Sequence, residues 1–313
     1  MFDLDLIIIG AGPAGLTAAQ YGARANLKVL VIERLSSGGQ ALIIDVLENY
    51  PGNIGQNGEP KSGYEFAMDL HRQAENFGAL FLSGEVSSIT KENDSFTVNM
   101  QNGEKHKASS VIIASGAKPR RLDIPGEEEF SGRGVSYCAT CDGNFFKGKK
   151  IFVVGGGDAA CDEARYLSRL SDNVILVHRR DAFRAQKALA QRTFENPNIK
   201  VRFNTVIREI KGEKKVKSVI TENVLTGAAC EEDADAVFIF AGTVPQSSLA
   251  AGLNAALDDE GYIITDGKMA ANIPGLYAAG DVRSGAFRQV VTAAADGATA
   301  AHNAAKHVDE LIS

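Results

Sequence analysis

The chain has 313 residues, of which 44% are hydrophobic and 23% charged, so it can bury the cores of two domains of ordinary size and is not disordered. Its formal net charge of −6 argues against a general nucleic-acid-binding protein, whose surface would be basic. No apolar run is long enough for a membrane span, and the acidic N-terminus lacks the features of a signal peptide. These properties predict a cytoplasmic protein that binds neither nucleic acid nor membranes.

The first predicted unit is a strand, a glycine-rich turn and a helix. The β-branched run Asp5–Ile9 predicts a buried parallel strand, and Leu16–Ala25 has helical periodicity. The next apolar run ends at Glu33, at the spacing expected of an acid that binds a ribose hydroxyl. Small residues let the backbone approach a pyrophosphate, and those of the turn are Gly10, Ala11, Gly12, Pro13, Ala14 and Gly15. The unit therefore predicts a dinucleotide-binding site, because strand, turn, helix and acid all occur in order.

A long irregular segment and several short strands come next. Leu35–Gly63 is rich in Gly, Ser, Asn and Pro, which predicts a functional loop region, and Tyr64–Phe77 has helical periodicity. Short apolar runs predict strands at Leu80–Leu82, Phe96–Met100 and Val111–Ala114. The last of these leads into Gly116–Arg120, which is a predicted crossing between two domains.

Two of the four cysteines, Cys138 and Cys141, are separated by two residues. This spacing commonly lowers the pKa of one thiol and lets the pair close a disulfide ring. Half of a zinc site is the alternative, but a structural zinc site needs another close pair or suitably spaced histidines. The pattern therefore favours a redox-active pair. Cys161 and Cys230 are isolated, and we interpret them as ordinary core or surface residues.

A second strand, turn and helix follow the cysteines. Apolar Ile151–Val154 runs into the small residues Gly155–Ala160, and Asp162–Leu170 has helical periodicity. The next strand, Val174–Val177, ends in positive charge where the first unit has Glu33. The basic residues there are His178, Arg179, Arg180 and, shortly after, Arg184. Arginine binds a 2′-phosphate bidentately and a carboxylate repels it, so the second unit predicts NADP and the first FAD or NAD. A solvated charged turn is the alternative interpretation.

The last third of the chain returns to the first domain. Lys200–Phe240 alternates short strands with charged turns, and Phe238–Pro245 repeats the pattern of the first crossing, an apolar strand followed by small residues and proline. Gly275–Val282 predicts a strand that ends in Asp281, an acid placed to bind a sugar-like hydroxyl. A small-residue helix is predicted over Val291–Ala305. It is opened by Arg288, Gln289 and Val290.

In combination these motifs resemble the bacterial-type, low-molecular-weight thioredoxin reductases, over essentially the whole chain. No single motif suffices, but the combination is highly specific. The matching motifs are Gly10-x-Gly12-x-x-Gly15 with Glu33, Gly38-Gly39-Gln40, Asn49-Tyr50-Pro51-Gly52, Cys138-x-x-Cys141-Asp142-Gly143, Gly155-x-Gly157-Asp158, His178-Arg179-Arg180 with Arg184, and Ala279-Gly280-Asp281 with Arg288-Gln289.

The resemblance implies an α/β fold with two Rossmann-like three-layer nucleotide-binding domains, in which the NADPH domain is inserted into the FAD domain. With the two crossings, it predicts a discontinuous FAD domain over residues 1–117 and 245–313 and an NADPH domain over 118–244 that carries the redox disulfide. It also implies a homodimer. The implied reaction is that of a thioredoxin-disulfide reductase: hydride passes from NADPH to FAD, electrons then reduce the Cys138–Cys141 disulfide, and the dithiol exchanges with thioredoxin.

The resemblance also assigns roles to residues. Cys141 lies nearer the flavin, Cys138 attacks the thioredoxin disulfide, and Asp142 is the general acid and base; a turn former before Gly143 is the alternative interpretation of Asp142. The predicted FAD-binding residues are Gly10, Gly12, Pro13, Ala14, Gly15, Glu33, Gly39, Gln40, Asn49, Gly116, Gly280, Asp281, Arg288, Gln289 and Val290. The predicted NADPH-binding residues are Gly155, Gly157, Asp158, Ala159, Ala160, His178, Arg179, Arg180 and Arg184. No metal ligand is predicted.

The sequence departs from the family at one position. Ala159 stands where the family often has Ser or Thr, which removes a possible phosphate contact and predicts modestly weaker NADPH binding. The disulfide and the nicotinamide belong to one domain and must both reach one flavin, so we expect the two domain orientations to alternate about the crossings near Lys118 and Val244. Candidates for contact with thioredoxin are Arg133, Phe145 and Phe146; the aromatic pair can equally be core.

Two competing functions are open. A related flavin disulfide reductase could serve another protein or a small disulfide as acceptor; this chain starts directly at its first nucleotide-binding strand, so it must meet its redox partner in trans. A relative that passes electrons to ferredoxin without cysteines is excluded by Cys138 and Cys141. A non-enzymatic redox sensor or nucleotide-binding regulator is disfavoured, because the sequence carries no DNA-binding segment.

Overall fold

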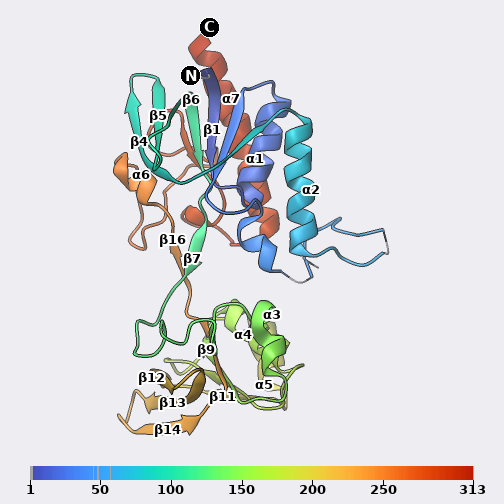
Figure 1. Cartoon of the computed structure of the whole chain (residues 1–313), viewed down its shortest axis with the longest axis vertical. Coiled ribbons are helices and arrows are strands. Elements are labelled where there is room, and N and C mark those ends of the chain that lie inside the picture. Colours follow the sequence, from blue (N-terminus) through green and yellow to red (C-terminus); the bar gives the residue numbers. More distant parts are fainter. Residues whose placement is uncertain (1–2, 45, 48, 57, 313) are drawn as a thin grey trace. The chain divides into compact units, whose positions relative to one another are not determined.

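The computed structural model describes residues 3–44, 46–47, 49–56 and 58–312 (Figure 1). The chain divides into two compact units. Unit 1 comprises Met1–Lys118 and Val244–Ser313, and unit 2 comprises Pro119–Thr243. These divisions lie within one residue of the expected boundaries.

The centre of unit 1 is a mainly parallel sheet with the strand order β3-β2-β1-β6-β5-β4, in which β17 also pairs with β6. Strands β1, β2, β3, β6 and β17 pair in parallel, whereas β4 and β5 form an antiparallel extension beside β6. The strands are β1 (Asp3–Ile9), β2 (Val29–Glu33), β3 (Leu80–Ser83), β4 (Val86–Glu92), β5 (Ser95–Met100), β6 (Lys105–Ile113) and β17 (Leu276–Ala278).

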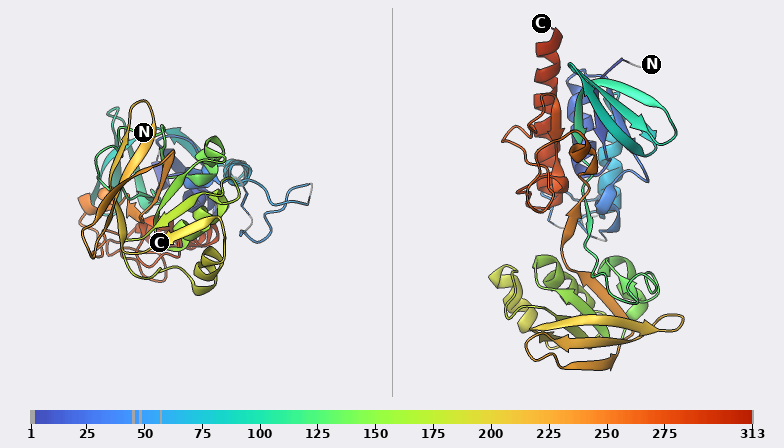
Figure 2. Two further views of the ribbon diagram at one scale, coloured as in Figure 1. Left: turned by 90° about the horizontal axis from the view of Figure 1, so that it is seen from below. Right: turned by 90° about the vertical axis from the view of Figure 1, so that its left-hand side faces the viewer.

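Both faces of this sheet are buried. Leu6 and Ile8 of β1 pack with one apolar cluster that includes α1 and α7, and Ile7 and Ile9 pack with a second cluster that includes β5. In the side view of Figure 2, α7 and the β4–β5 hairpin lie on opposite sides of unit 1. The helices of unit 1 are α1 (Pro13–Arg24), η1 (Gly39–Ile43), α2 (Gly63–Asn76), α6 (Ser248–Gly252), η3 (Gly280–Val282) and α7 (Val290–Ile312). Because both faces of the sheet are buried, β1 carries the continuous apolar run Leu6–Ile9.

Several elements of unit 1 differ from the sequence expectation. Helix α1 begins at Pro13 instead of Leu16, since proline is favoured in the first turn of a helix. The loop region expected over Leu35–Gly63 contains the short helix η1. Strand β4 was not expected, because Ile89 is its one buried residue among exposed and half-buried neighbours. Helix α7 extends well beyond Ala305, to Ile312.

Unit 2 contains a parallel sheet with the order β11-β10-β9-β15-β8 and an antiparallel sheet β12-β13-β14. The strands are β8 (Val135–Ser136), β9 (Ile151–Gly155), β10 (Val174–Val177), β11 (Ile199–Arg202), β12 (Thr205–Gly212), β13 (Val216–Asn223), β14 (Ala229–Asp233) and β15 (Ala236–Phe240). The helices are α3 (Ala139–Asp142), η2 (Gly143–Phe146), α4 (Asp158–Leu167) and α5 (Lys187–Phe194).

Helices α4 and α5 of unit 2 also depart from expectation. Helix α4 begins at Asp158, four residues before the expected start at Asp162, because Gly157 already ends the turn in an extended conformation and Asp158 suits the positive end of the helix dipole. Helix α5 was not expected, because its one buried residue is Thr193 and it lacks an apolar stripe.

The two crossings pair with each other. Strands β7 (Ala117–Pro119) and β16 (Thr243–Pro245) form a small sheet, and the Arg120 amide donates to the Gly242 carbonyl at 2.8 Å. Within the described part of the chain, no helix has the length and apolarity that crossing a membrane requires.

Candidate functional site

The first glycine turn is closed by backbone contacts and open on one side. A Cβ on Gly10 would lie 2.4 Å from the Ala114 carbonyl oxygen, and Gly10 has a φ of +103°. A Cβ on Gly15 would lie 1.8 Å from the Gly10 carbonyl oxygen. Gly12, in contrast, has no heavy atom within 4 Å of its ideal Cβ position. The first and third glycines therefore let strand and helix meet, while the second borders space at the start of α1.

Glu33 is anchored beside this turn. One carboxylate oxygen accepts the Ala11 amide at 2.8 Å and the other accepts the Leu35 amide at 2.9 Å. The Gly38 amide donates to the Ala11 carbonyl at 2.7 Å, and a Cβ on Gly39 would lie 3.1 Å from the Gly12 Cα. Residues far apart in the sequence thus meet at one end of the sheet.

Other predicted FAD residues are joined by hydrogen bonds. The Asn49 side-chain amide donates to the Gln289 side-chain oxygen at 3.0 Å. The Gln40 side chain donates to the Ala117 carbonyl at 2.6 Å. Gln246 was not predicted, yet its backbone amide donates to the Gly116 carbonyl at 2.9 Å. Its side chain also donates to the Ser115 carbonyl at 2.6 Å. No sequence pattern singled out this glutamine.

The segment with Asp281 lies at the start of α7. Pro13 and Val290 are the first residues of α1 and α7, and Ala14 is buried between these helices. A Cβ on Gly280, which has a φ of +77°, would lie 3.0 Å from the Ala14 methyl group. Burial raises the pKa of the Asp281 carboxyl, while the Arg288 guanidinium opposes that shift.

Two residues that the sequence did not indicate support this segment. Asp296 of α7 is 6% exposed and accepts hydrogen bonds from Arg283 and from the Gly280 amide. The Arg288 guanidinium lies over the Tyr262 ring, 4.6 Å from its centroid. The sequence shows Asp296 as an acid within a helix of small residues. Its spacing along the chain does not indicate a contact with Gly280.

The second glycine turn repeats the geometry of the first. A Cβ on Gly155 would lie 2.4 Å from the Phe240 carbonyl oxygen, and a Cβ on Gly156 would lie 2.3 Å from the His178 ring. Gly157 borders open space. Asp158 accepts hydrogen bonds from the Gln186 backbone amide at 2.7 Å and from its side chain at 2.8 Å.

Ala159 is exposed, whereas Ala160 is fully buried in the core of unit 2. The methyl group of Ala160 therefore cannot contact a ligand, and its backbone amide in the first turn of α4 is the group available for that role.

Positive charge surrounds the end of β10. His178 is 6% exposed, and its pKa is lowered by burial, then by Arg184 and Arg180. The three arginines Arg179, Arg180 and Arg184 are exposed, and none forms an ion pair with another described residue. The Arg184 amide donates to the Gly156 carbonyl at 2.7 Å, which ties the basic loop to the glycine turn. Unpaired guanidinium groups beside a glycine turn suit an anion such as a phosphate.

The cysteine motif begins a short helix. Cys138 is disulfide-bonded and precedes α3, whereas Cys161 and Cys230 are free, the first buried and the second exposed. The side chain of Cys141 lies outside the described residues. The Cys138 amide donates to the Ser136 hydroxyl oxygen at 3.1 Å, and the Asp142 amide donates to the Cys138 carbonyl at 3.2 Å.

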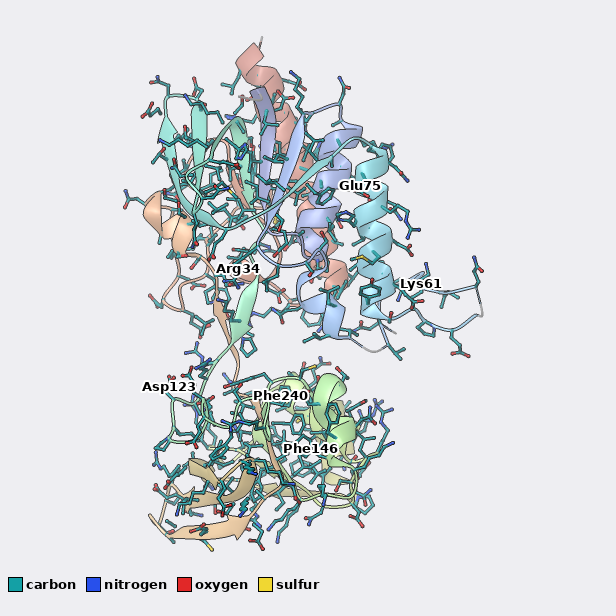
Figure 3. All side chains as sticks on the ribbon, in the orientation of Figure 1. Arg34, Lys61, Glu75, Asp123, Phe146 and Phe240 are labelled. Atoms are coloured by element: carbon teal, nitrogen blue, oxygen red, sulfur yellow. The ribbon has the colours of Figure 1, made fainter. Side chains whose placement is uncertain are left out.

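The three candidates for contact with thioredoxin differ in how exposed they are. Phe145 is 79% exposed, whereas Phe146 is half-buried and its ring meets the Phe238 ring edge-on, with centroids 5.9 Å apart (Phe146 is labelled in Figure 3). The Arg133 side chain is exposed and contacts the Phe130 ring and the Glu129 carbonyl. The core interpretation therefore holds for Phe146, and Phe145 stays available to a partner.

The fold and these two turns match known proteins. The family model for pyridine nucleotide-disulphide oxidoreductases matches residues 4–297, which makes the chain a member of that class. The chain is 53% identical over 309 residues to a thioredoxin reductase of Treponema pallidum, with 99% of this chain and 98% of that protein covered. The chain therefore belongs to the thioredoxin reductases within this class.

Solved structures of thioredoxin reductases have a similar fold. The Lactococcus lactis thioredoxin reductase in its FR conformation has a TM-score of 0.91 and 44% sequence identity, covering 98% of this chain and all of that one. The T. acidophilum thioredoxin reductase has a TM-score of 0.87 and 34% identity, with 99% of both chains covered. The family implies FAD and NADPH as cofactors.

The residues present fit both cofactors. Gly12 and Gly157 each border open space at a helix start whose N-cap residue offers no side-chain hydrogen bond, so the helix amides can face a pyrophosphate. Glu33 ends β2 beside the first turn, and unpaired arginines follow the second. The acid suits an unphosphorylated ribose and the arginines suit a 2′-phosphate.

Proposed function

We propose that the chain catalyses the NADPH-dependent reduction of a thioredoxin disulfide. The observation that carries the proposal is the disulfide at Cys138, which lies in the same unit as the arginine-bordered glycine turn. The 53% identity to a thioredoxin reductase over nearly the whole chain supports the same activity.

The residues fall into two binding groups. Unit 1 would hold FAD through the turn at Gly10–Gly15, the Glu33 carboxylate and the Gly280–Asp281 segment. Unit 2 would hold NADPH through the turn at Gly155–Ala160 and the arginines around His178. When bound, FAD accepts hydride from NADPH and delivers two electrons to a disulfide.

Cys138 and Cys141 would form the disulfide that receives these electrons. Its reduction takes up two electrons and two protons and leaves two thiols. The Cys138 thiol then loses its proton, and the resulting thiolate attacks one sulfur of the thioredoxin disulfide, forms a mixed disulfide and releases a thiolate on thioredoxin. Cys141 attacks Cys138 in the mixed disulfide, which restores the ring and frees reduced thioredoxin.

Asp142 would move the protons in this exchange. It is half-buried at the end of α3, next in sequence to Cys141. We expect Asp142→Asn to slow disulfide reduction and to leave flavin reduction by NADPH unchanged. Stopped-flow absorbance separates the two steps, and equal slowing of both would contradict the role.

Turnover would require the two units to change their orientation. The paired crossings β7 and β16 are the joints between the units, and each contains a proline. A cross-link that locks unit 1 to unit 2 should stop turnover and leave FAD bound. Normal turnover of the locked enzyme would overturn this hypothesis.

We also propose a cytoplasmic homodimer. Support comes from the family resemblance and from exposed apolar side chains on unit 1, among them Ile54 and Tyr64. Light scattering should give twice the mass of the chain. A mass equal to one chain at micromolar concentration would contradict the dimer.

The deciding experiment measures NADPH consumption with thioredoxin as the acceptor. Wild type should turn over, while Cys138→Ser and Cys141→Ser should each lose thioredoxin reduction and keep flavin bleaching by NADPH. A second acceptor class, a small disulfide, is tested in the same assay. Turnover with a small disulfide but with no thioredoxin would favour the related flavin disulfide reductase.

A further inference from the structure

A buried carboxylate of unit 2 belongs to neither glycine turn. Glu127 is 2% exposed, and among the described residues Asp296 of unit 1 is the other buried acid. A charge in the interior needs several hydrogen bonds to offset its lost hydration. The partners of Glu127 therefore indicate what this residue holds together.

Glu127 accepts hydrogen bonds from two separate segments. The Leu122 amide lies 3.0 Å from both carboxylate oxygens, and the Asp123 amide lies 2.7 Å from Oε2. The Tyr137 hydroxyl donates to Oε1 at 2.6 Å. Asp123 has a φ of +55°, in the left-handed region, and this turn directs successive amides toward the carboxylate.

The two segments have distinct places in the chain. The turn at Leu122–Ile124 follows β7, the first crossing, after Arg120 and Arg121; Asp123 is labelled in Figure 3. Tyr137 follows β8 and directly precedes Cys138, the disulfide-bonded residue. One carboxylate thus joins the turn after the first crossing to the residue that directly precedes the redox motif.

The Tyr137 side chain is held as a donor. Burial raises the pKa of the Tyr137 hydroxyl, and the Glu127 hydrogen bond raises it further, so the group stays protonated at neutral pH. Leu122 and Ile124 pack against the same apolar cluster as Tyr137, which keeps the turn and the ring side by side.

We propose that Glu127 is a positioning residue for the redox dithiol, which it serves by clamping the peptide before Cys138 to the turn that follows the first crossing. This inference rests on the role assigned to Cys138 above. In this assignment Glu127 and Tyr137 act on the dithiol through the main chain.

The clamp should affect the two redox states unequally. In the oxidised state the disulfide ring already restrains the residues after Tyr137, whereas in the dithiol state that covalent restraint is gone. The clamp therefore costs the dithiol more conformational freedom than the disulfide. Its removal should favour the dithiol and make the reduction potential less negative.

The test is the Tyr137→Phe variant of the FAD-loaded enzyme, equilibrated with glutathione buffers and trapped by alkylation. We expect the dithiol-to-disulfide equilibrium constant to rise by about fivefold, since one hydrogen bond to a charged acceptor is lost. This corresponds to roughly 20 mV for the two-electron couple. Glu127→Gln, which keeps the side-chain shape, should shift the potential in the same direction.

The control is Tyr277→Phe in unit 1, which also removes one tyrosine hydroxyl bond, to the Asn303 carbonyl at 3.0 Å. It should leave the potential at the wild-type value. A wild-type potential in Tyr137→Phe, or an equal shift in both variants, would overturn the clamp. Because glutathione replaces thioredoxin here, failure of thioredoxin reduction by the wild type would count against the proposed function alone.

Discussion

Arg283 and Asp296 form a largely buried ion pair that supports the segment after β17. The Arg283 Nε lies 2.5 Å from Asp296 Oδ2 and its Nη2 lies 2.9 Å from Oδ1, while the Gly280 amide donates to Oδ2 at 3.2 Å. Asp296 thus ties the strand end that carries Asp281 to the first turns of α7. Its negative charge also adds to the raised pKa of Asp281.

Breaking this pair should weaken both the fold and FAD binding. We expect Asp296→Ala to destabilise unit 1 by about 3–5 kcal/mol, because it leaves the largely buried Arg283 guanidinium without its carboxylate partner. The double variant Arg283→Met with Asp296→Leu should recover most of that loss. Thermal unfolding followed by flavin fluorescence checks both. If Asp296→Ala proved as stable as the wild type, that result would contradict the role of the pair.

The exposed arginines should decide the choice between NADPH and NADH. We expect Arg184→Ala to raise the KM for NADPH by about 10–100-fold, since a charge-assisted bond to the 2′-phosphate is lost. The KM for NADH should change by less than about twofold, because NADH has no such phosphate. Steady-state rates with both cofactors measure the difference. Equal changes in the KM for NADPH and for NADH would indicate that the arginines form only a solvated turn.

Two adjacent glycines should have separable effects. Gly156→Ala would place a Cβ 2.3 Å from the His178 ring, so we expect a lower melting temperature for the protein without NADPH. Gly157→Ala would place its Cβ in open space, so we expect an unchanged melting temperature and weaker NADPH binding. Differential scanning fluorimetry and NADPH titration distinguish them. Equal melting temperatures for both variants would count against the packing at Gly156.

Glu163 should make stability depend on pH. Burial, then the Asp162 charge, raises its pKa from 4.5 to about 7 in the folded protein. Below pH 4.5 both folded and unfolded states hold the proton. As the pH rises from 4.5 to 7, the unfolded state loses it first, so stability falls; above 7 the loss is constant.

Glu163→Gln should therefore stabilise the protein at pH 8 by about 1–2 kcal/mol, which is roughly 2–6 °C in the transition temperature. At pH 4.5 the variant and the wild type should melt together. Melting curves across this range check the sign, and a stabilisation that is equal at both pH values would contradict the raised pKa.

Sequence patterns located the parts of the site that depend on local backbone geometry. The turns at Gly10 and Gly155 lie where predicted, because a glycine that lets strand and helix meet leaves a local signature. Glu127 and Asp296 escaped prediction because their partners are amides and side chains brought close by the fold. Helix α5 escaped because it buries little apolar surface.

The pairing of β7 with β16 means that the inserted unit leaves and re-enters its host at adjacent points. A short peptide could bridge Lys118 and Val244, and the strands of unit 1 would still pair as they do now. Unit 2 is therefore an inserted domain, and unit 1 is the domain that receives it. Such an arrangement allows a different nucleotide-binding module to be exchanged at the same place without redesign of the surrounding sheet.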